Sequence, residues 1–248
     1  MFLTQKQIMK AVILAAGLGT RLLPLTANIH KGLLTIGNKS LLEHTISALS
    51  ENKIKDIFLV VSHRKEQIKN YFGNGSKFNV NITYLEQENP KGGTADAVRC
   101  AKEKIEESFI LLNGDIFFHP LLIKRLMDSF VDCDGLITCK EVENPQDFGI
   151  LKIEDERIVR IFEKSQNPPS NFGNLGIYLL PEKIFEAIDQ TLLSKRGEYE
   201  LTDSIQILID KGFIFKPVFA NEFWIDVGRI SDYEKANELY KTWKSSIH

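Results

Sequence analysis

A glycine-rich loop near the N-terminus is the first segment whose residues could do chemistry. It spans Ala16–Arg21, with the sequence Ala-Gly-Leu-Gly-Thr-Arg, directly after the apolar run Ala11–Ala15. Small residues let the backbone approach a polyphosphate closely, and backbone amides can then donate hydrogen bonds to its oxygens. Because a glycine pair after a strand can also form a plain tight turn, the loop alone leaves both interpretations open.

Two common phosphate-binding motifs do not fit this loop. A Walker A loop needs lysine and then serine or threonine after its second glycine, and that order is missing. A dinucleotide fingerprint needs a third glycine where this chain has Leu22. Instead, Arg21 can bind phosphate oxygens bidentately, and Lys31 can supply a mobile point charge. The combination favours a phosphate site of another kind.

Two aspartates each follow an apolar run that ends like a buried strand. Asp115 closes Leu111–Asp115, and Asp226 closes Phe223–Asp226. Open α/β sheets bind ligands at the carboxyl ends of their strands. Two carboxylates there suit Mg²⁺, which prefers oxygen ligands and commonly bridges to substrate phosphates. Either aspartate, taken alone, could instead form a turn or a helix cap.

The first half of the chain alternates short apolar runs with amphipathic stretches. Such alternation predicts an α/β fold, with a mainly parallel, Rossmann-like sheet flanked by helices. The predicted strands are Ala11–Ala15, Ile57–Val61, Ile82–Leu85, Phe109–Leu112 and Leu136–Cys139. The predicted helices are Leu41–Ser50, Glu66–Phe72, Thr94–Ile105 and Leu121–Phe130.

The pattern changes after about Glu141, where strands are shorter and connections tighter. The expected strands are Phe148–Ile153, Ile158–Phe162, Gly176–Leu180, Phe213–Phe219 and Phe223–Ile225. The expected helices are Glu182–Asp189, Thr202–Lys211 and a last one opening with Ser231 and Glu234 at capping-box spacing. Because no long linker rich in Gly, Pro or Ser separates the halves, we interpret the second half as a lobe folded over the first sheet.

Composition excludes several classes of protein. With 248 residues, 43% hydrophobic and 26% charged, the chain suits one domain with a sizeable core. A net charge of -2 argues against general nucleic-acid binding. The cysteines at 100, 133 and 139 are too scattered for a zinc cluster or a disulfide framework, so a reduced cytoplasmic setting is expected. The run Ala11–Ala16 is too short to span a membrane.

The glycine loop with Lys31 ten residues after Arg21 resembles the signature of the sugar-1-phosphate nucleotidylyltransferases. That family includes glucose-1-phosphate thymidylyl- and uridylyltransferases and mannose-1-phosphate guanylyltransferases. The resemblance extends from about Met9 to Trp243 and implies the nucleotide-diphospho-sugar transferase fold. It implies catalytic roles for Arg21, Lys31 and Asp115, and Mg²⁺ as the cofactor. The implied metal ligands are Asp115 and Asp226.

The same resemblance implies which residues contact the nucleotide. The segment Gln87–Val98 is similar to the family segment in which glutamine and glycine backbone read the nucleobase. A plain helix entry at Gly93 is the structural alternative. The family usually has proline before the lysine, where this chain has His30. The implied nucleotide-binding residues are Ala15, Ala16, Gly17, Gly19, Thr20, Arg21, Gln87, Gly92, Gly93 and Thr94.

Three segments of the second half resemble the sugar-binding motifs of the family. They are Asn144–Gly149, Phe162–Lys164 and Gly173–Tyr178. A polyol needs hydrogen-bond acceptors and a phosphate needs a cation, which the Glu-Lys pair would supply. Gly197–Asp203 is interpreted as mainly structural, with Glu198 as a minor contact. The implied sugar-phosphate-binding residues are Gly149, Glu163, Lys164 and Asn174.

The implied reaction transfers a nucleotidyl group from a nucleoside triphosphate to a hexose 1-phosphate and releases pyrophosphate. A pyrimidine, as UTP or dTTP, is favoured because the second half looks most like thymidylyl- and uridylyltransferases. Alternatives are a mannose- or heptose-1-phosphate guanylyltransferase and a cytidylyltransferase acting on a non-sugar phosphate. An inactive regulatory relative should have lost one of the key charged residues, and all are present. A nicotinamide enzyme is disfavoured by the missing third glycine.

The implied organisation is a single nucleotidyltransferase domain over residues 1–248. It comprises an N-terminal extension (1–8), a nucleotide-binding part (9–140), a sugar-binding lobe (141–225), and the metal aspartate with the C-terminal helix (226–248). Since the chain ends soon after that helix, no left-handed β-helix is expected. The expected partners are the two substrates, with no nucleic acid and no membrane, and a homo-oligomer is left open.

Overall fold

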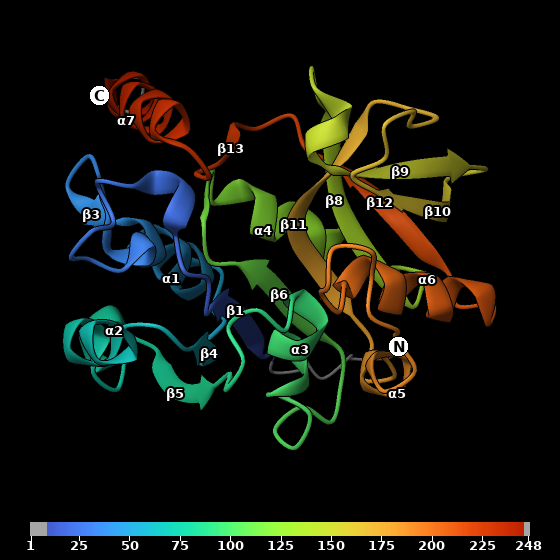
Figure 1. The fold of residues 1–248 in the computed structure, drawn as a ribbon, viewed down its shortest axis with the longest axis horizontal. Coiled ribbons are helices and arrows are strands. Elements are labelled where there is room, and N and C mark those ends of the chain that lie inside the picture. The colour runs from blue at the N-terminus through green and yellow to red at the C-terminus, as the bar shows by residue number, and fades with distance from the viewer. Residues whose placement is uncertain (1–8, 246–248) are drawn as a thin grey trace, which may run out of the picture.

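The computed structural model describes residues 9–245 and contains one nine-stranded sheet with helices on both faces (Figure 1). Two two-stranded sheets accompany it. The expected extension over residues 1–8 lies outside the described residues, and so do the last three residues of the chain. The α/β class, with its central, mainly parallel sheet, is confirmed.

The parallel part of the sheet is centred on the first strand. Its members are β1 (Ala11–Ala15), β4 (Asp56–Val61), β5 (Asn81–Glu86) and β6 (Phe109–Asn113). Strand β1 is parallel to β4 on one side and to β6 on the other, and β5 is parallel to β4. These strands contain continuous apolar runs, as expected for the centre of a parallel sheet, because such a sheet is covered by helices and buried on both faces.

Successive residues of these strands enter two separate apolar clusters, one on each face. Ile13 and Leu112 belong to one cluster, whereas Val12 and Leu111 belong to the other, as the period of two along a strand requires. The first cluster includes residues of α1 (Leu41–Glu51), α2 (Lys65–Phe72) and α4 (Leu121–Asp128). The second includes residues of α3 (Thr94–Arg99), α5 (Ile184–Ile188) and α6 (Leu201–Asp210).

The second half of the chain extends the same sheet. It adds β8 (Gly135–Glu141), β9 (Gly149–Glu154), β10 (Arg157–Glu163), β11 (Phe172–Leu180) and β12 (Phe215–Phe219). Strand β11 joins the halves, because it pairs antiparallel with β6, β8 and β9. The strand order is β10-β9-β11-β6-β1-β4-β5, with β8 paired to β11 and β12 paired to β8.

One glycine allows β11 to pass close to the end of β6. The register between β11 and β8 shifts between Asn174 and Tyr178. Gly176, inside this shift, has a left-handed φ of 74°, and a Cβ there would collide with the side chain of Asn113. Only glycine meets both demands without strain, so β11 can lie against the strand end that carries Asn113.

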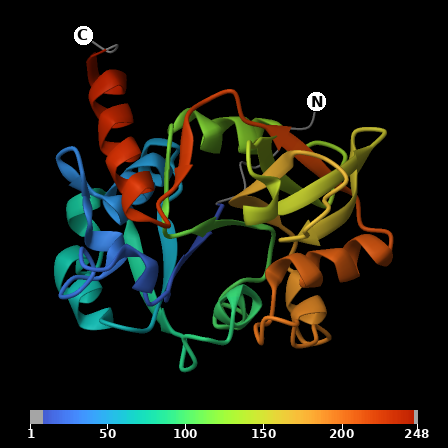
Figure 2. The same ribbon diagram turned by 45° about the horizontal axis from the view of Figure 1, so that its top comes forward.

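The C-terminal helix packs against a hairpin from the start of the chain (Figures 1 and 2). Helix α7 (Ile230–Ser245) follows β13 (Trp224–Asp226), which pairs antiparallel with β7 (Ile116–Phe118). The hairpin consists of β2 (Thr35–Ile36) and β3 (Lys39–Ser40). Three hydrogen bonds join the hairpin to helix α7. Gly37 N–H donates to Asn237 Oδ1 at 2.9 Å, Tyr233 Oη donates to Thr35 O at 2.9 Å, and Tyr240 Oη donates to Asn38 Oδ1 at 2.6 Å.

An aromatic cluster fills the space between α7, β7 and α1. Phe117 is fully buried, and its ring centroid lies 5.0 Å from His44, 5.2 Å from Phe223 and 6.5 Å from Trp243. Edge-to-face and tilted contacts of this kind add to the burial of apolar area. The cluster fixes β7 and the aspartate that precedes it relative to the C-terminal helix.

Most predicted helices match the structure within two residues at each end, and two differences have a clear physical reason. The helix expected over Thr94–Ile105 ends at Arg99 and continues as tight turns, in which Ala101 and Ile105 still reach the core. The apolar spacing was therefore satisfied by turns as well as by a helix. The last helix begins at Ile230, and the Asp232 carboxylate caps it by accepting from Arg229 N–H at 2.8 Å, so the expected Ser231 cap is wrong.

Over residues 9–245, no helix is at once long enough and apolar enough to cross a bilayer.

Short 3₁₀ helices occur at η3 (Ser76–Phe78) and η4 (Pro145–Asp147). Helix α1 opens with a regular cap, because Ser40 Oγ accepts from Glu43 N–H at 3.2 Å.

We expect Phe117→Ala to lower the free energy of unfolding by about 3–5 kcal/mol, because it removes a fully buried ring and leaves a cavity. Denaturant unfolding followed by tryptophan fluorescence would measure the change. Leu192→Ala is the matched control, since Leu192 is 82% exposed and should change stability by less than about 0.5 kcal/mol. Equal effects of the two substitutions would contradict the role given to the aromatic cluster.

Candidate functional site

Asp115 lies in the turn between β6 and β7, beside the carboxyl end of β1. The preceding Gly114 N–H donates to Leu14 O at 2.9 Å, and a Cβ on Gly114 would clash with that oxygen. The Asp115 carbonyl accepts from Val227 N–H at 2.8 Å. The backbone of Asp115 is therefore fixed both by the central strand and by the segment that follows β13.

Lys31 reaches Asp115 from the glycine-loop side. It opens the 3₁₀ helix η2 (Lys31–Leu33), and its Nζ lies 2.5 Å from Asp115 Oδ2. Their side chains are 13% and 21% exposed, so the pair is only partly open to solvent. Burial opposes ionisation of Asp115, but the charge and hydrogen bond of Lys31 outweigh it and lower the pKa of Asp115.

Asp226 joins this pair through the small sheet of β7 and β13, whose register sets it opposite Ile116. Burial, reinforced by the charge of Asp115, raises the pKa of Asp226 to about 7, while Lys31 and Arg21 act in the opposite direction. Two carboxylates this close resist carrying both charges unless more positive charge is present.

The carboxylate pair fits Mg²⁺. No third His, Cys, Asp or Glu completes a metal-binding group with them in the part of the chain that the structure describes. Mg²⁺ is commonly held by one or two carboxylates, with phosphate and water oxygens filling its other positions. A structural zinc site would instead need four protein ligands.

The glycine loop surrounds Lys31. Gly19 has a left-handed φ of 68° and precedes η1 (Thr20–Leu22), and its carbonyl accepts from Thr26 Oγ1 at 2.8 Å. A Cβ on Gly17 would lie 3.4 Å from Lys31 Nζ. The loop is therefore a tight turn at Gly19 and also a cavity wall, so the two interpretations offered by the sequence are compatible.

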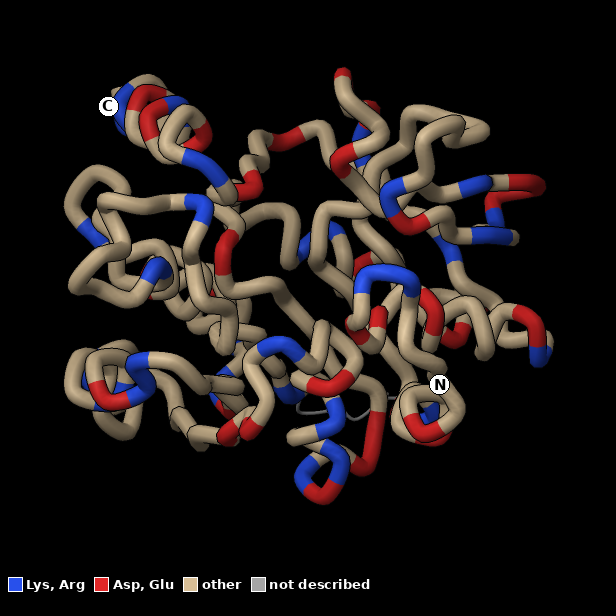
Figure 3. The backbone as a smooth tube through the Cα atoms, in the orientation of Figure 1, with Lys and Arg blue, Asp and Glu red and all other residues tan. Residues whose placement is uncertain are grey.

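A cavity next to this loop, here named the loop cavity, is lined by basic side chains from both halves of the chain. Basic and acidic residues are intermixed along the chain as a whole (Figure 3), so this gathering is local. The Arg21 guanidinium approaches Gly228, where a Cβ would lie 3.4 Å from Nη2. Among the lining residues are Gly17, Gly19, Thr20, Arg21, Lys31, Lys91, Lys164, Arg196 and Gly228.

A second cavity, named the Gln87 cavity, adjoins the first at Gly17 and Lys31. Its lining includes Leu14, Ala16, Gln87, Pro90, Gly93, Thr94, Asn113, Asp115 and Glu198. Two of the expected nucleotide contacts, Ala15 and Gly92, lie outside the lining of both cavities. Gly92 N–H donates to Asn89 O and its carbonyl accepts from Tyr199 N–H, so its backbone is engaged within the protein.

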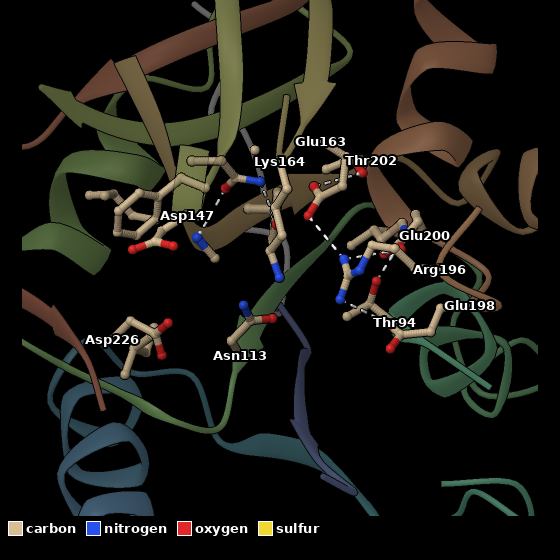
Figure 4. A pocket seen from close by; sticks show the side chains of 18 of the residues that line it. Thr94, Asn113, Asp147, Glu163, Lys164, Arg196, Glu198, Glu200, Thr202 and Asp226 are labelled. Carbon is tan, nitrogen blue, oxygen red and sulfur yellow. Dashed lines mark hydrogen bonds and ion pairs between the residues drawn. The ribbon is translucent and has the colours of Figure 1, made fainter. Parts of the chain in front are cut away.

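The third cavity, named the Glu163 cavity, brings together all four residues expected to contact the sugar phosphate. Gly149, Glu163, Lys164 and Asn174 line it, together with Asp226. Figure 4 shows Lys164, Asn113 and Asp226 around the same space. Thr94, Asn113 and Glu198 line both this cavity and the Gln87 cavity, so the two are neighbours.

Polar side chains of the Glu163 cavity are held by partners within the protein. Glu163 accepts from Thr202 Oγ1 at 3.1 Å and pairs with Arg196 at 3.5 Å. Asn174 Oδ1 accepts from Gly176 N–H at 3.0 Å, and its Nδ2 donates to Tyr178 Oη at 2.7 Å. These contacts fix the orientation of both side chains.

Arg196 is a site residue that the sequence analysis missed. It precedes the segment Gly197–Asp203, of which only Glu198 was singled out. Arg196 lines the loop and Glu163 cavities, and it also pairs with Glu200 at 3.2 Å. A cation next to the Gly-Glu-Tyr-Glu motif was visible in the sequence, but nothing there indicated that it lies beside Glu163 rather than in solvent.

Comparison with known proteins shows the family of the chain. The family model described as nucleotidyl transferase matches residues 10–242. The bifunctional protein GlmU of Methanocaldococcus jannaschii is 41% identical over 231 residues, which cover 93% of this chain and 54% of that protein. The low-salt glycan biosynthesis nucleotidyltransferase Agl11 of Haloferax volcanii is 37% identical, with 96% of this chain and 67% of that protein covered.

A solved structure has the same fold. It is a putative glucose-1-phosphate thymidylyltransferase from Bacillus anthracis in complex with a sucrose, with a TM-score of 0.84 and 28% identity over 93% of this chain and 94% of the other. The chain therefore belongs to the nucleotidyl transferase family, and its resemblance to the sugar-1-phosphate nucleotidylyltransferases is confirmed. It spans about half the length of its GlmU relative, 54%.

His30, next to Lys31, makes stability depend on pH. It is 2% exposed, and its Nε2 has no partner at normal hydrogen-bond geometry among residues 9–245. Burial first, and then the charge of Lys31, lower its pKa from 6.5 to about 4. The unfolded chain therefore binds a proton more readily than the folded one between these pH values. Stability from this group is full above pH 6.5 and declines as the pH falls towards 4.

We expect His30→Asn to remove this part of the pH dependence, since asparagine Oδ1 can still accept from Gly32 N–H as His30 Nδ1 does at 3.0 Å. Between pH 7 and 4 the wild type should lose about 3 kcal/mol more unfolding free energy than the variant. Denaturant titrations across that range measure the difference, with His119→Asn as control, since His119 is not among the groups that shift the pKa of His30. Parallel curves for wild type and His30→Asn would contradict the assignment.

Proposed function

We propose that this chain transfers a nucleotidyl group from a nucleoside triphosphate, with UTP or dTTP favoured, to a hexose 1-phosphate, releasing pyrophosphate. The observation that carries the proposal is that Lys31 and Asp115 form an ion pair, that Asp226 interacts with both, and that these three residues between them line the three neighbouring cavities. The loop cavity offers a glycine loop and cations for the triphosphate. The Glu163 cavity offers hydrogen-bond acceptors for sugar hydroxyls and the cation Lys164.

The triphosphate would occupy the loop cavity and the base the Gln87 cavity. Backbone groups of the glycine loop would donate to phosphate oxygens, and Arg21 would bind the departing pyrophosphate. Gln87, with backbone groups near Gly93, would contact the edge of the base. The full proposed set remains Ala15, Ala16, Gly17, Gly19, Thr20, Arg21, Gln87, Gly92, Gly93 and Thr94.

The sugar phosphate would occupy the Glu163 cavity. Glu163 would accept hydrogen bonds from sugar hydroxyls, and the amides of Gly149 and Asn174 would contact other oxygens. Lys164 would bind the phosphate. Arg196 lines the same cavity and the loop cavity, so it would add a second cation between the two anionic substrates.

The proposed chemistry is an in-line displacement. An oxygen of the sugar phosphate attacks the α-phosphorus of the triphosphate, a new P–O bond forms, and the bond to the β-phosphate oxygen breaks. The attacking phosphate is already an anion near neutral pH, so no strong general base is required. Lys31 and Lys164 offset the repulsion between the substrates, and rate enhancement comes from positioning and charge neutralisation.

Asp115 and Asp226 would hold Mg²⁺, which when bound supplies positive charge to phosphate oxygens. Until then, Lys31 partly neutralises the carboxylate pair, at 2.5 Å from Asp115. The three free cysteines are compatible with a cytoplasmic location, which we include in the proposal.

A substrate matrix tests the proposal and its alternatives. Pyrophosphate release would be measured as kcat/KM for UTP, dTTP, GTP and CTP, each with glucose, N-acetylglucosamine, mannose and heptose 1-phosphates and with phosphocholine. A preference for GTP with mannose or heptose 1-phosphate would replace the proposed pair by a guanylyltransferase. A preference for CTP with phosphocholine would replace it by a cytidylyltransferase.

We expect Asp115→Asn and Lys31→Ala each to lower kcat/KM by about 10²–10³ with the best substrate pair, since each removes a preorganised charge at the reacting phosphates. Lys124→Ala on the exposed face of α4 is the control, because Lys124 is 62% exposed and pairs only with Asp128. Circular dichroism checks that the variants fold. Near-normal turnover of folded Asp115→Asn or Lys31→Ala would contradict the catalytic role proposed for that residue.

We expect chelation with EDTA to abolish pyrophosphate release and added Mg²⁺ to restore it, because the two carboxylates would hold the cation only with phosphate oxygens. In Asp226→Asn the Mg²⁺ concentration for half-maximal rate should rise about tenfold or more, by the usual effect of losing metal-site contacts. Full activity in metal-free buffer would refute the role of the carboxylate pair.

A further inference from the structure

The side-chain amide of Gln87 is held in one orientation. Its backbone N–H donates to Val61 O at 2.9 Å, which continues the pairing of β5 with β4. Its side-chain Nε2 donates to Asp96 Oδ2 at 2.9 Å and to Gly93 O at 3.3 Å. Both of these partners can only accept, so the nitrogen end of the amide must face them.

Asp96 is itself fixed by Arg99, on the side away from Gln87. Its other oxygen, Oδ1, pairs with Arg99 Nη1 at 3.0 Å. Arg99 lies over the ring of Tyr199, and its Nη2 donates to Ile188 O at 3.4 Å. A Cβ on Gly92 would overlap Asp96 Oδ2, so the backbone also closes around this carboxylate. Each carboxylate oxygen therefore has one fixed partner.

The oxygen end of the Gln87 amide remains available. Gln87 is 5% exposed and lines the Gln87 cavity. Its Oε1 accepts no hydrogen bond from any residue between 9 and 245. A carbonyl oxygen in this position can bind only a hydrogen-bond donor.

We propose that Asp96, anchored by Arg99, is a specificity-determining positioning residue that fixes the amide of Gln87 so that its oxygen meets a ring N–H of the nucleobase. The inference rests on the proposed function and adds the reason for its base preference. Uracil and thymine, and also guanine, carry such an N–H beside a carbonyl. Cytosine and adenine have a lone pair at the corresponding ring nitrogen, which would face the Gln87 oxygen without a hydrogen.

Replacing Asp96 by asparagine should reverse the amide. Arg99 donates only, so it would retain the oxygen of Asn at position 96, and the new amide nitrogen would face Gln87. Two NH₂ groups cannot bond one another, so the Gln87 amide would turn its oxygen towards position 96 and offer its nitrogen to the cavity, giving up its longer 3.3 Å bond to Gly93 O. The single change therefore converts an acceptor for the base into a donor, and it leaves the phosphate-binding residues in place.

The experiment compares wild type, Asp96→Asn and Asp96→Glu by pyrophosphate release with UTP, dTTP, GTP, CTP and ATP and one sugar 1-phosphate. We expect wild type to prefer UTP, dTTP or GTP over CTP and ATP. In Asp96→Asn the preferred triphosphate should lose about tenfold in kcat/KM, mainly through KM, as for one buried hydrogen bond. The ratio of kcat/KM for the preferred triphosphate to kcat/KM for CTP should fall by at least about tenfold as well. Asp96→Glu keeps an acceptor and should retain most of the preference.

Asp128→Asn is the matched control, an exposed carboxylate-to-amide change on α4 that should leave the ratios unchanged. If Asp96→Asn does not fold, Asp96→Ser replaces it, since a hydroxyl can donate or accept and should narrow the preference. Unchanged base ratios in the folded variant would overturn the inference while leaving the proposed function intact. A wild type that prefers CTP or ATP would overturn the inference and also the preference for UTP or dTTP in the proposed function. Wild type that releases no pyrophosphate with any pair would overturn both.

Discussion

The contact between Lys31 and Asp115, with Asp226 beside it, is the constraint on which the rest of the structure depends. The lysine and the first carboxylate are 84 residues apart, and the second carboxylate comes from near the C-terminus. Partly buried charges of both signs are stable together only if each is held close to the others. The central strand β1 and the turn at Gly114 fix Asp115, and the small sheet of β7 and β13 fixes Asp226.

Elements outside the cavities also support this group. The backbone N–H of His30 donates to Gln67 Oε1 at 2.7 Å, and Arg64 donates to carbonyls of the segment that leads to His30. The side chains of Arg64, just before α2, and Gln67, within α2, thus hold the residues that precede Lys31, although proline is not present to stiffen them. On the other side, the C-terminal helix and the aromatic rings around Phe117 fix β7. Helix α7 therefore helps to fix β7, next to Asp115, while the charge of its Asp232 contributes to the raised pKa of Asp226.

Many polar side chains of the site are already paired within the protein. Lys31 pairs with Asp115, Glu163 with Arg196, and Gln87 with Asp96. Such pairs avoid the cost of burying lone charges and amides. They also hold each side chain in one orientation, which reduces the ordering that a substrate must impose when it binds.

The sequence by itself determined the α/β class, the family and, within residues 9–245, the strands except the short β2, β3 and β7, because apolar runs and ordered motifs are local patterns that survive in any fold of this type. It also indicated Lys31, Asp115 and Asp226 as chemical candidates. Only the tertiary structure decided that these three meet, that Arg196 lies beside Glu163, and that Gly92 is engaged within the protein. It also placed the end of α3 at Arg99 and the cap of α7 at Asp232. These outcomes depend on contacts between distant residues, such as the orientation that Asp96 and Arg99 impose on Gln87, and spacing along a chain does not encode them.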